Sequence, residues 1–305
     1  MEQDKEVWGM FGKPTNTSKA AIFSVLVLVM AVGAALVIRT LGLTDGMGMW
    51  ILWSCTPTVA ALVMLLVVTR EGYSKEGWKS LGLHRLGLSV WWLAFWVTLL
   101  VGVAATAIVW ATPLASVVVP EYGILSTIID FFFVLVVFTP TFLLAEEIGI
   151  RGYLLPKLLP LGMGRALLLS GLVWAAWHLP LFYLTSLFPT GNALIFIPLV
   201  VGTIVAASFL FGYLRIYTGS VWPCSIAHTV HNSLVDTLVA FTATSSPVLV
   251  NLYLVGDNGI LILVSTALGA VWVGNILRRR ASNRPQPGEA TPEATAAPEA
   301  GVAPS

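Results

Sequence analysis

The sequence predicts an all-α fold: a polytopic transmembrane helical bundle of about eight spans. Composition is the first observation behind this prediction. Of the 305 residues, 57% are hydrophobic and only 10% are charged, and the mean hydropathy is +0.87. Soluble domains carry about 25% charged residues. The second observation is a series of apolar stretches that reach the roughly 20 residues needed to cross a bilayer.

Eight such stretches follow one another along the chain. They cover residues 20–38, 46–69, 88–112, 122–155, 166–184, 193–214, 216–242 and 258–277. The fourth is interrupted by Asp130, Pro140 and a pair of glutamates, so its spanning part is predicted to run from about Asp130 to Leu155. No internal repeat is visible, and no pair of matching broken helices suggests the inverted halves of a transporter.

The basic residues predict the orientation of the bundle. On an eight-span arrangement, all sixteen lysines and arginines except Arg39 fall on one side. The positive-inside rule then places both termini in the cytoplasm. We expect a multi-pass protein of a bacterial plasma membrane, although the sequence does not settle its source. A cleaved signal peptide is the alternative for the first span, but that stretch is longer than usual and follows several acidic residues.

Three regions are predicted along the chain. Residues 1–19 form a cytoplasmic N-terminal segment, and residues 20–277 form one transmembrane helical domain. Residues 278–305 are rich in Ala, Pro, Glu and Thr and have no apolar face, which predicts a disordered cytoplasmic tail. The net charge of +1 and the lack of a basic stripe argue against nucleic acid as a partner.

Polar residues lie inside three of the apolar stretches, where each charge costs at least ~2.5 kcal/mol. They are Glu146, Glu147 and Arg151, then His178, then His228 and Asn232. At a helix rise of ~1.5 Å per residue, His178 and His228 each lie about 18 Å from the cytoplasmic ends of their spans. Glu146 lies about 14 Å from the end of its own span. The three spans therefore deliver polar groups to one level.

Helical spacing predicts which of these residues share a face. Glu147 with Arg151, and His228 with Asn232, are four residues apart and can point the same way. Asp236 continues the second stripe by one turn. Small residues that permit close helix packing flank the polar groups. They are Gly149, Gly152, Ser170, Gly171, Ala175 and Ala176.

Each of these polar residues also has a structural interpretation. A single histidine such as His178 can serve only to bond a neighbouring carbonyl, and a Glu147–Arg151 pair is more often a structural clasp. His231 and Asp236 are expected to be structural. Glu146, His178 and His228 together are not expected of packing residues alone, and they suggest water activation inside a membrane.

The three strings resemble the motifs of the CPBP family of intramembrane proteases. Glu146-Glu147-Ile148-Gly149-Ile150-Arg151 resembles EExxxR, Trp174-xxx-His178 resembles FxxxH, and His228-xxx-Asn232 resembles HxxxN. The family includes CAAX prenyl endopeptidases and bacterial bacteriocin-processing and immunity proteins. The resemblance covers roughly residues 120–242, with the motifs in order on separate helices. Trp174 departs from the usual Phe, which bears on the shape of the pocket.

The resemblance implies a helical core inside the membrane with a polar cavity opening to the cytoplasm, and it implies a role for each residue. It implies that Glu146 and His178 activate water, that His228 and Asn232 stabilise the oxyanion, and that Glu147 and Arg151 organise the site. Chemistry agrees, since a desolvated carboxylate is a better general base near neutral pH and the oxyanion needs nearby donors. Glu146, His178 and His228 also form a His₂Glu set like those of catalytic zinc sites, but no HExxH motif exists. We favour metal-independent chemistry narrowly over zinc.

The sequence therefore predicts an intramembrane endopeptidase that acts near the cytoplasmic face of the membrane. Its expected partners are the lipid bilayer and a peptide or protein substrate, such as a lipidated tail or a bacteriocin-like peptide. One alternative is a non-enzymatic immunity or chaperone-like membrane protein that retains the motif scaffold. A proton-coupled transporter is the less favoured alternative.

Overall fold

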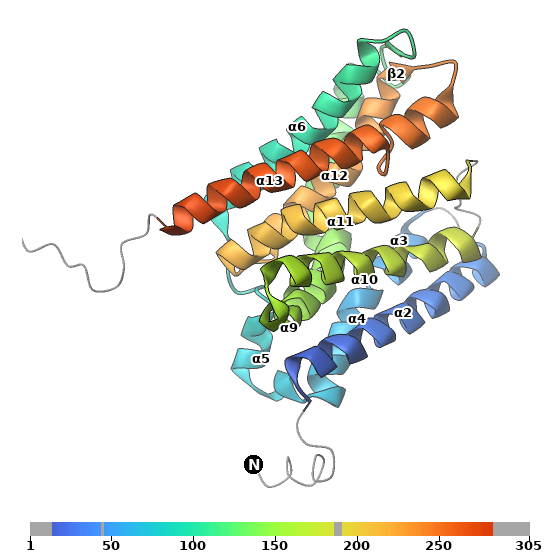
Figure 1. The fold of residues 1–305 in the computed structure, drawn as a ribbon. Coiled ribbons are helices and arrows are strands. Elements are labelled where there is room, and N and C mark those ends of the chain that lie inside the picture. The colour runs from blue at the N-terminus through green and yellow to red at the C-terminus, as the bar shows by residue number, and fades with distance from the viewer. Residues whose placement is uncertain (1–13, 44–45, 186–190, 283–305) are drawn as a thin grey trace, which may run out of the picture.

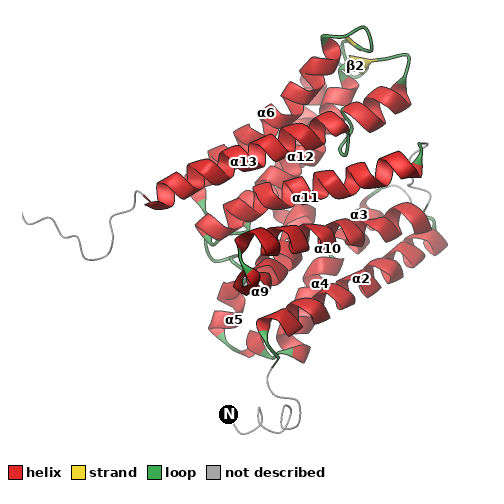
Figure 2. Cartoon of the chain, viewed as in Figure 1, coloured by secondary structure: helices red, strands yellow, loops and turns green. Residues whose placement is uncertain are grey.

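A computed structural model describes residues 14–43, 46–185 and 191–282 of the chain. Helices make up nearly all of these residues (Figure 2). The one pair of strands among them is short, with β1 (Ser116–Val117) antiparallel to β2 (Thr242–Ala243). The predicted all-α helical bundle is confirmed.

Seven helices in the described part of the chain are long and apolar enough to cross a membrane. Four of them are single elements: α2 (Asn16–Leu41), α10 (Met163–Leu184), α11 (Ala193–Thr218) and α13 (Ile260–Ser282). The second span joins α3 (Met47–Ser54), α4 (Thr56–Val63) and η1 (Met64–Val68), and the third joins η3 (Leu88–Val90) to α6 (Trp91–Trp110). Short elements outside the spans are η2 (Glu71–Tyr73), α5 (Lys75–Ser80) and η7 (Val248–Leu254).

The eighth predicted segment is α12 (Trp222–Ala240), a helix of 19 residues. It is not among the seven apolar helices, because two histidines, an asparagine and an aspartate interrupt its apolar residues. Its start also differs from the prediction of a span beginning near Ile216. Helix α11 continues to Thr218 and ends at Gly219, whose φ of 68° suits a glycine.

The fourth predicted span is a continuous helical path from Ile124 to Leu161, 38 residues long. It comprises α7 (Ile124–Phe138), η4 (Thr139–Leu143), α8 (Leu144–Glu147), η5 (Ile148–Leu154), α9 (Leu155–Leu158) and η6 (Leu159–Leu161). The helix extends beyond Asp130 and Leu155 at both ends, and these limits of the membrane-spanning part remain a prediction. Pro140 cannot donate a backbone hydrogen bond, yet the chain accommodates it in the π-helical turn η4 and continues.

The basic segments gather at one end of the bundle, which we call the basic end. Glu71 there accepts hydrogen bonds from Lys19 at 2.6 Å and Lys157 at 2.9 Å. These contacts bring together the start of α2, the loop after η1 and the end of the long helix. Figure 1 shows α5, α9 and the C-terminal end of α13 at this same end. The membrane orientation predicted from these charges remains a prediction.

Small residues allow the helices around the polar groups to approach closely. A Cβ added at Gly149 would lie 2.4 Å from the Pro57 side chain, so the long helix contacts α4 at van der Waals limits. A Cβ at Gly171 would lie 2.9 Å from Ser208, on the neighbouring α11. Helices α10 and α11 lie side by side in Figure 1. The predicted packing role of these glycines is therefore consistent with the structure.

The limits of the helical domain in the structure differ from the predicted limits by a few residues. Helix α2 begins at Asn16 rather than after residue 19, and α13 extends to Ser282, so residues 278–282 are helical rather than part of a disordered tail. Basic side chains at a helix C-terminus are favourable, which suits the arginines that end α13. Residues 283–305, on which the rest of that prediction falls, lie outside the described residues.

Candidate active site

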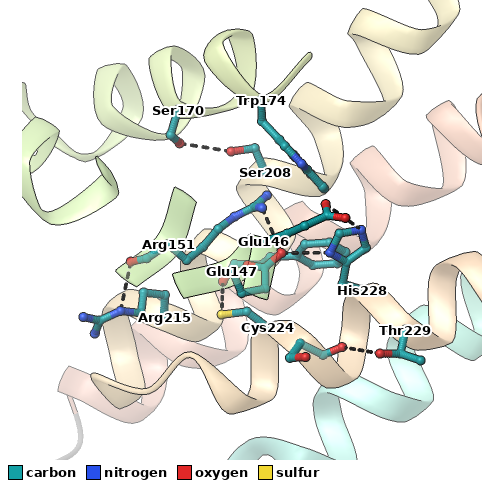
Figure 3. A network of polar contacts seen from close by, with 12 residues as sticks. Glu146, Glu147, Arg151, Ser170, Trp174, Ser208, Arg215, Cys224, His228 and Thr229 are labelled. Atoms are coloured by element: carbon teal, nitrogen blue, oxygen red, sulfur yellow. Dashed lines mark hydrogen bonds and ion pairs between the residues drawn. The ribbon is translucent and has the colours of Figure 1, made fainter. Parts of the chain in front are cut away.

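The two adjacent glutamates lie where α8 passes into the π-helical segment η5, and both are buried. Glu147 is 0% exposed, and its Oε1 accepts hydrogen bonds from Arg151 Nη1 and His228 Nδ1, each at 2.9 Å (Figure 3). The pair predicted from helical spacing is therefore present and gains a third member from α12. π-Helical turns inside α-helices are common at functional sites.

Glu146 makes different contacts from its neighbour. It is 4% exposed, and its Oε1 accepts a hydrogen bond from Ser54 Oγ at 2.9 Å. Its Oε2 lies 4.0 Å from His228 Nε2. Ser54, on α3, was not singled out in the sequence, because a serine within an apolar helix looks the same whether it packs or binds a carboxylate.

Hydrogen bonds fix the tautomers of both histidines. His178 Nδ1 lies 2.9 Å from the backbone carbonyl oxygen of Trp174, which can only accept. The Nδ1 of His178 therefore carries the proton, and Nε2 of the neutral ring is an acceptor. His228 Nδ1 likewise donates to Glu147, a carboxylate that is already paired with Arg151. The Nε2 atoms are thus the free nitrogens of both rings.

Trp174 packs at the centre of the group. The Arg151 guanidinium lies 3.9 Å from the centre of its ring, a cation–π contact that helps to hold a charge buried at 0% exposure. The ring centres of His178 and His228 lie 5.7 and 5.0 Å away, both in edge-on arrangements. The indole Nε1 is buried beside Glu146 and has no partner with full hydrogen-bond geometry.

One cavity of about 220 Å³ receives the four residues predicted to be catalytic. Its lining includes Glu146, His178, His228 and Asn232, which come from the long helix, α10 and α12. Glu147 and Arg151 do not line it and lie buried behind His228, which agrees with their predicted supporting place. The structure therefore brings the predicted residues together, while their catalytic roles remain predictions.

Two residues expected to be structural also line this cavity. His231 Nε2 lies 3.2 Å from the backbone oxygen of Asp257, which is a structural contact of the expected kind. Asp236 has no such contact to a basic residue in the described part of the chain, and its carboxylate is exposed to the cavity. Thr203, Asp257 and Asn258 also line the cavity, and none of them was identified from the sequence.

The cavity extends away from the basic end. Its lining reaches Leu181 and Phe182 near the end of α10, and Asp257 and Asn258 in the segment before α13. Towards the basic end, Arg215 is held between the backbone oxygens of Arg151 at 3.1 Å and Ser80 at 2.7 Å, in a closed contact layer. The predicted opening of the cavity to the cytoplasm remains a prediction, because no side of the membrane is assigned to either end of the bundle.

The depth estimate failed because α12 begins inside the bundle. His228 lies six residues, or about 9 Å, after Trp222 rather than 12 residues after a surface position. The preceding Ser220 is fully buried and donates to the Arg85 backbone oxygen. The common level of the three motifs was predicted correctly, but its distance from each end was not.

The His₂Glu set that the sequence offers as the alternative to metal-independent chemistry is not found as a preformed metal site among the described residues. Among them, no three His, Cys, Asp or Glu side chains converge in a way that would hold a metal ion. The tautomers leave Nε2 of His178 and His228 available, but both histidines and Glu146 are not gathered around one point. We therefore derive no reaction step through zinc.

One family model matches the part of the chain that carries the three motifs. Residues 125–234 match the family model described as type II CAAX prenyl endopeptidase Rce1-like. The match includes all three motifs and the four residues predicted to be catalytic. No curated protein matches the sequence.

Proposed function

We propose, from the Rce1-like type II CAAX prenyl endopeptidase domain formed by residues 125–234, that this protein hydrolyses a peptide bond inside the membrane. The observation that carries the proposal is the shared cavity. A carboxylate, two imidazoles and an amide from three different helices line one buried space, and the low dielectric there makes each costly unless it has a use.

Glu146 is the general base in this mechanism. Its carboxylate removes a proton from water as the water oxygen bonds to the carbonyl carbon of the scissile peptide. His178 Nε2 holds the same water, because its Nδ1 proton is committed to the Trp174 backbone. The protonated Glu146 then delivers the proton to the leaving amine as the carbon–nitrogen bond breaks.

Asn232 and His228 stabilise the oxyanion. The Asn232 amide donates in every protonation state, whereas His228 Nε2 donates only when the ring carries both protons, since Nδ1 already binds Glu147. The buried Glu147–Arg151 pair holds the His228 ring so that Nε2 points towards Glu146. This is a positioning role for Glu147 and Arg151.

The extent of the cavity supports cleavage in the half of the membrane away from the basic end. With both termini in the cytoplasm, as the charge distribution predicts, this differs from the cytoplasmic-face cleavage expected from the sequence. The substrate is a peptide segment or the tail of a membrane protein. A lipidated tail and a bacteriocin-like peptide both remain possible occupants under this proposal.

Replacement of the base tests the proposal directly. Protein purified in detergent is incubated with a peptide library, and products are identified by mass spectrometry. Glu146→Gln keeps the side-chain shape but removes the base, so cleavage is expected to fall by about 10²- to 10⁴-fold. Equal cleavage by both proteins would refute the catalytic assignment.

Glu76→Gln is the matched control, because Glu76 lies at the basic end with its side chain 80% exposed. It is expected to cleave like the natural sequence. A chelator added to the same assay separates the two mechanisms left open by the sequence. If cleavage is unchanged by the chelator, Glu146 acts on water without a metal. If the chelator abolishes cleavage and added zinc restores it, the result supports a zinc-dependent mechanism.

A further inference from the structure

A second and larger cavity continues from the candidate active site. It measures about 820 Å³ and lies against α7 and α12. It shares Trp50, Asn232 and Asp236 with the smaller cavity, so the two cavities adjoin, and we call them together the path. We call the larger cavity the acidic groove. A peptide bound in the acidic groove would contact Asn232, one of the proposed oxyanion donors.

The charged residues of this path are all acidic. Asp130 from α7 and Asp236 from α12 line the acidic groove and interact electrostatically with each other. Asp236 in turn interacts with Asp257 in the smaller cavity. None of the described residues that line either cavity is a lysine or an arginine. Like charges repel strongly where little water is present to screen them. Neighbouring carboxylates in these cavities therefore favour the binding of a cation that does not belong to this chain.

Apolar side chains make up much of the remaining lining and suit a chain rather than a bare ion. Trp50, Phe131, Phe138 and Leu143 lie in the walls with the two aspartates, and Ser126, Thr127 and Thr237 also line the groove. A peptide segment with apolar residues and one basic side chain matches these features. Its cation would lie between Asp130 and Asp236.

We propose that the acidic groove binds a lysine- or arginine-containing segment of the substrate beside the scissile bond. The inference rests on the proposed protease function and names the class of its substrate: a cationic membrane peptide. Asp130 and Asp236 are then specificity-determining residues. The basic residue enters from the end of the bundle opposite the protein's own basic loops.

Binding of designed peptides tests the inference without requiring cleavage. The full chain carrying Glu146→Gln is placed in phosphatidylcholine nanodiscs, whose headgroups carry no net charge. The probes are short fluorescent leucine–alanine peptides with a central lysine, norleucine or glutamate, measured by anisotropy. We expect the lysine peptide to bind at least about tenfold more tightly than the norleucine peptide, and the glutamate peptide to bind most weakly.

Amino-acid substitutions test whether Asp130 and Asp236 cause the preference for the lysine peptide. Asp130→Asn with Asp236→Asn should remove the lysine preference, and Asp130→Asn alone should reduce it. Glu121→Gln is the matched control, because Glu121 lies just before α7, is exposed and does not line the groove. It should retain the preference. Added salt should weaken lysine binding in the unchanged groove, which provides a measurement independent of any variant's folding.

Several outcomes would overturn the inference. Equal binding of the lysine and norleucine peptides would do so, as would a lysine preference that survives in the double variant. A preference that appears only in anionic lipid would assign the charge effect to the bilayer. The proposed function fails separately: lysine-selective binding without cleavage by the natural sequence refutes the protease, and cleavage without charge preference refutes only the groove.

Discussion

At the residue scale, Trp174 is the side chain on which the candidate site converges. It packs on Arg151, both histidine rings and Glu146, although the resembled motif usually has phenylalanine there. Phenylalanine would preserve a ring but would remove the buried indole N–H. The position therefore separates what the ring does by packing from what the N–H does for the Glu146 carboxylate.

Trp174→Phe is predicted to lower kcat by up to about 10-fold. The N–H beside Glu146 lacks full hydrogen-bond geometry, so its loss should cost less than the about 1.5–3 kcal/mol of a charged hydrogen bond. The measurement is steady-state cleavage of a peptide identified from the library. Trp177→Phe is the control, since Trp177 lies on the same helix but donates to Thr56 Oγ1 at 2.9 Å and does not line the cavity. It should lower stability while leaving kcat near its natural value. A Trp174→Phe protein with unchanged kcat would limit Trp174 to packing.

At the element scale, the long helix from Ile124 to Leu161 positions the glutamate pair. Its π-helical turns accommodate Pro140 and carry Gly149 against Pro57 of α4. Thr58 of α4 also donates a hydrogen bond to the Ala145 backbone oxygen at 2.5 Å, one residue before Glu146. The fit between α4 and the long helix therefore fixes where Glu146 and Glu147 lie.

Gly149→Ala is predicted to destabilise the protein by several kcal/mol, because the new Cβ would lie 2.5 Å from the Pro57 backbone oxygen, which cannot rotate away. Thermal unfolding in detergent measures the loss. Gly33→Ala is the matched control within a transmembrane helix. A Cβ there meets nothing within 4 Å, so stability should be unchanged or slightly higher. Equal melting temperatures for the two variants would contradict the close approach of α4.

At the scale of the whole molecule, Glu71 joins three distant segments at the basic end. It pairs with Lys19 and Lys157, and its side chain is 27% exposed. Burial alone would raise the pKa of Glu71, but the hydrogen bonds and charges of the two lysines outweigh it and lower the pKa below 4.5. A carboxylate with a lowered pKa in the folded state stabilises that state at neutral pH.

Glu71→Gln is therefore predicted to destabilise the protein at pH 7 by about 1 kcal/mol, since the ion pairs are partly exposed. The difference from the natural sequence should persist down to about pH 4.5, the value expected of the unfolded chain. It should then vanish as the pH falls through the lower pKa of the folded state. Paired thermal melts at pH 7 and below pH 4 measure it, and a difference that does not depend on pH would contradict the ion-pair origin.

Much of the bundle was predictable because its signals are local. The apolar stretches predicted eight helices. Seven of them are confirmed as long apolar helices, and the eighth, α12, is a helix that is more polar. The i, i+4 spacing predicted the Glu147–Arg151 pair, which forms at 2.9 Å. The helix ends were less predictable: the proline and the aspartate in the fourth stretch do not end it, because π-helical turns and neighbouring helices satisfy the backbone.

The sequence by itself determined which helices form, that the basic residues gather at one end, and which residues of three helices meet. Hydropathy, charge and helical spacing are properties of short segments, so they can be read without the fold. Only the tertiary structure decided that His228 binds Glu147, that Ser54 binds Glu146, and that the cavity extends away from the basic end towards Asp130 and Asp236. These features depend on how far each helix is rotated and how deep it begins, as α12 shows by starting at a buried loop. Packing between helices sets both quantities, and no single segment encodes them.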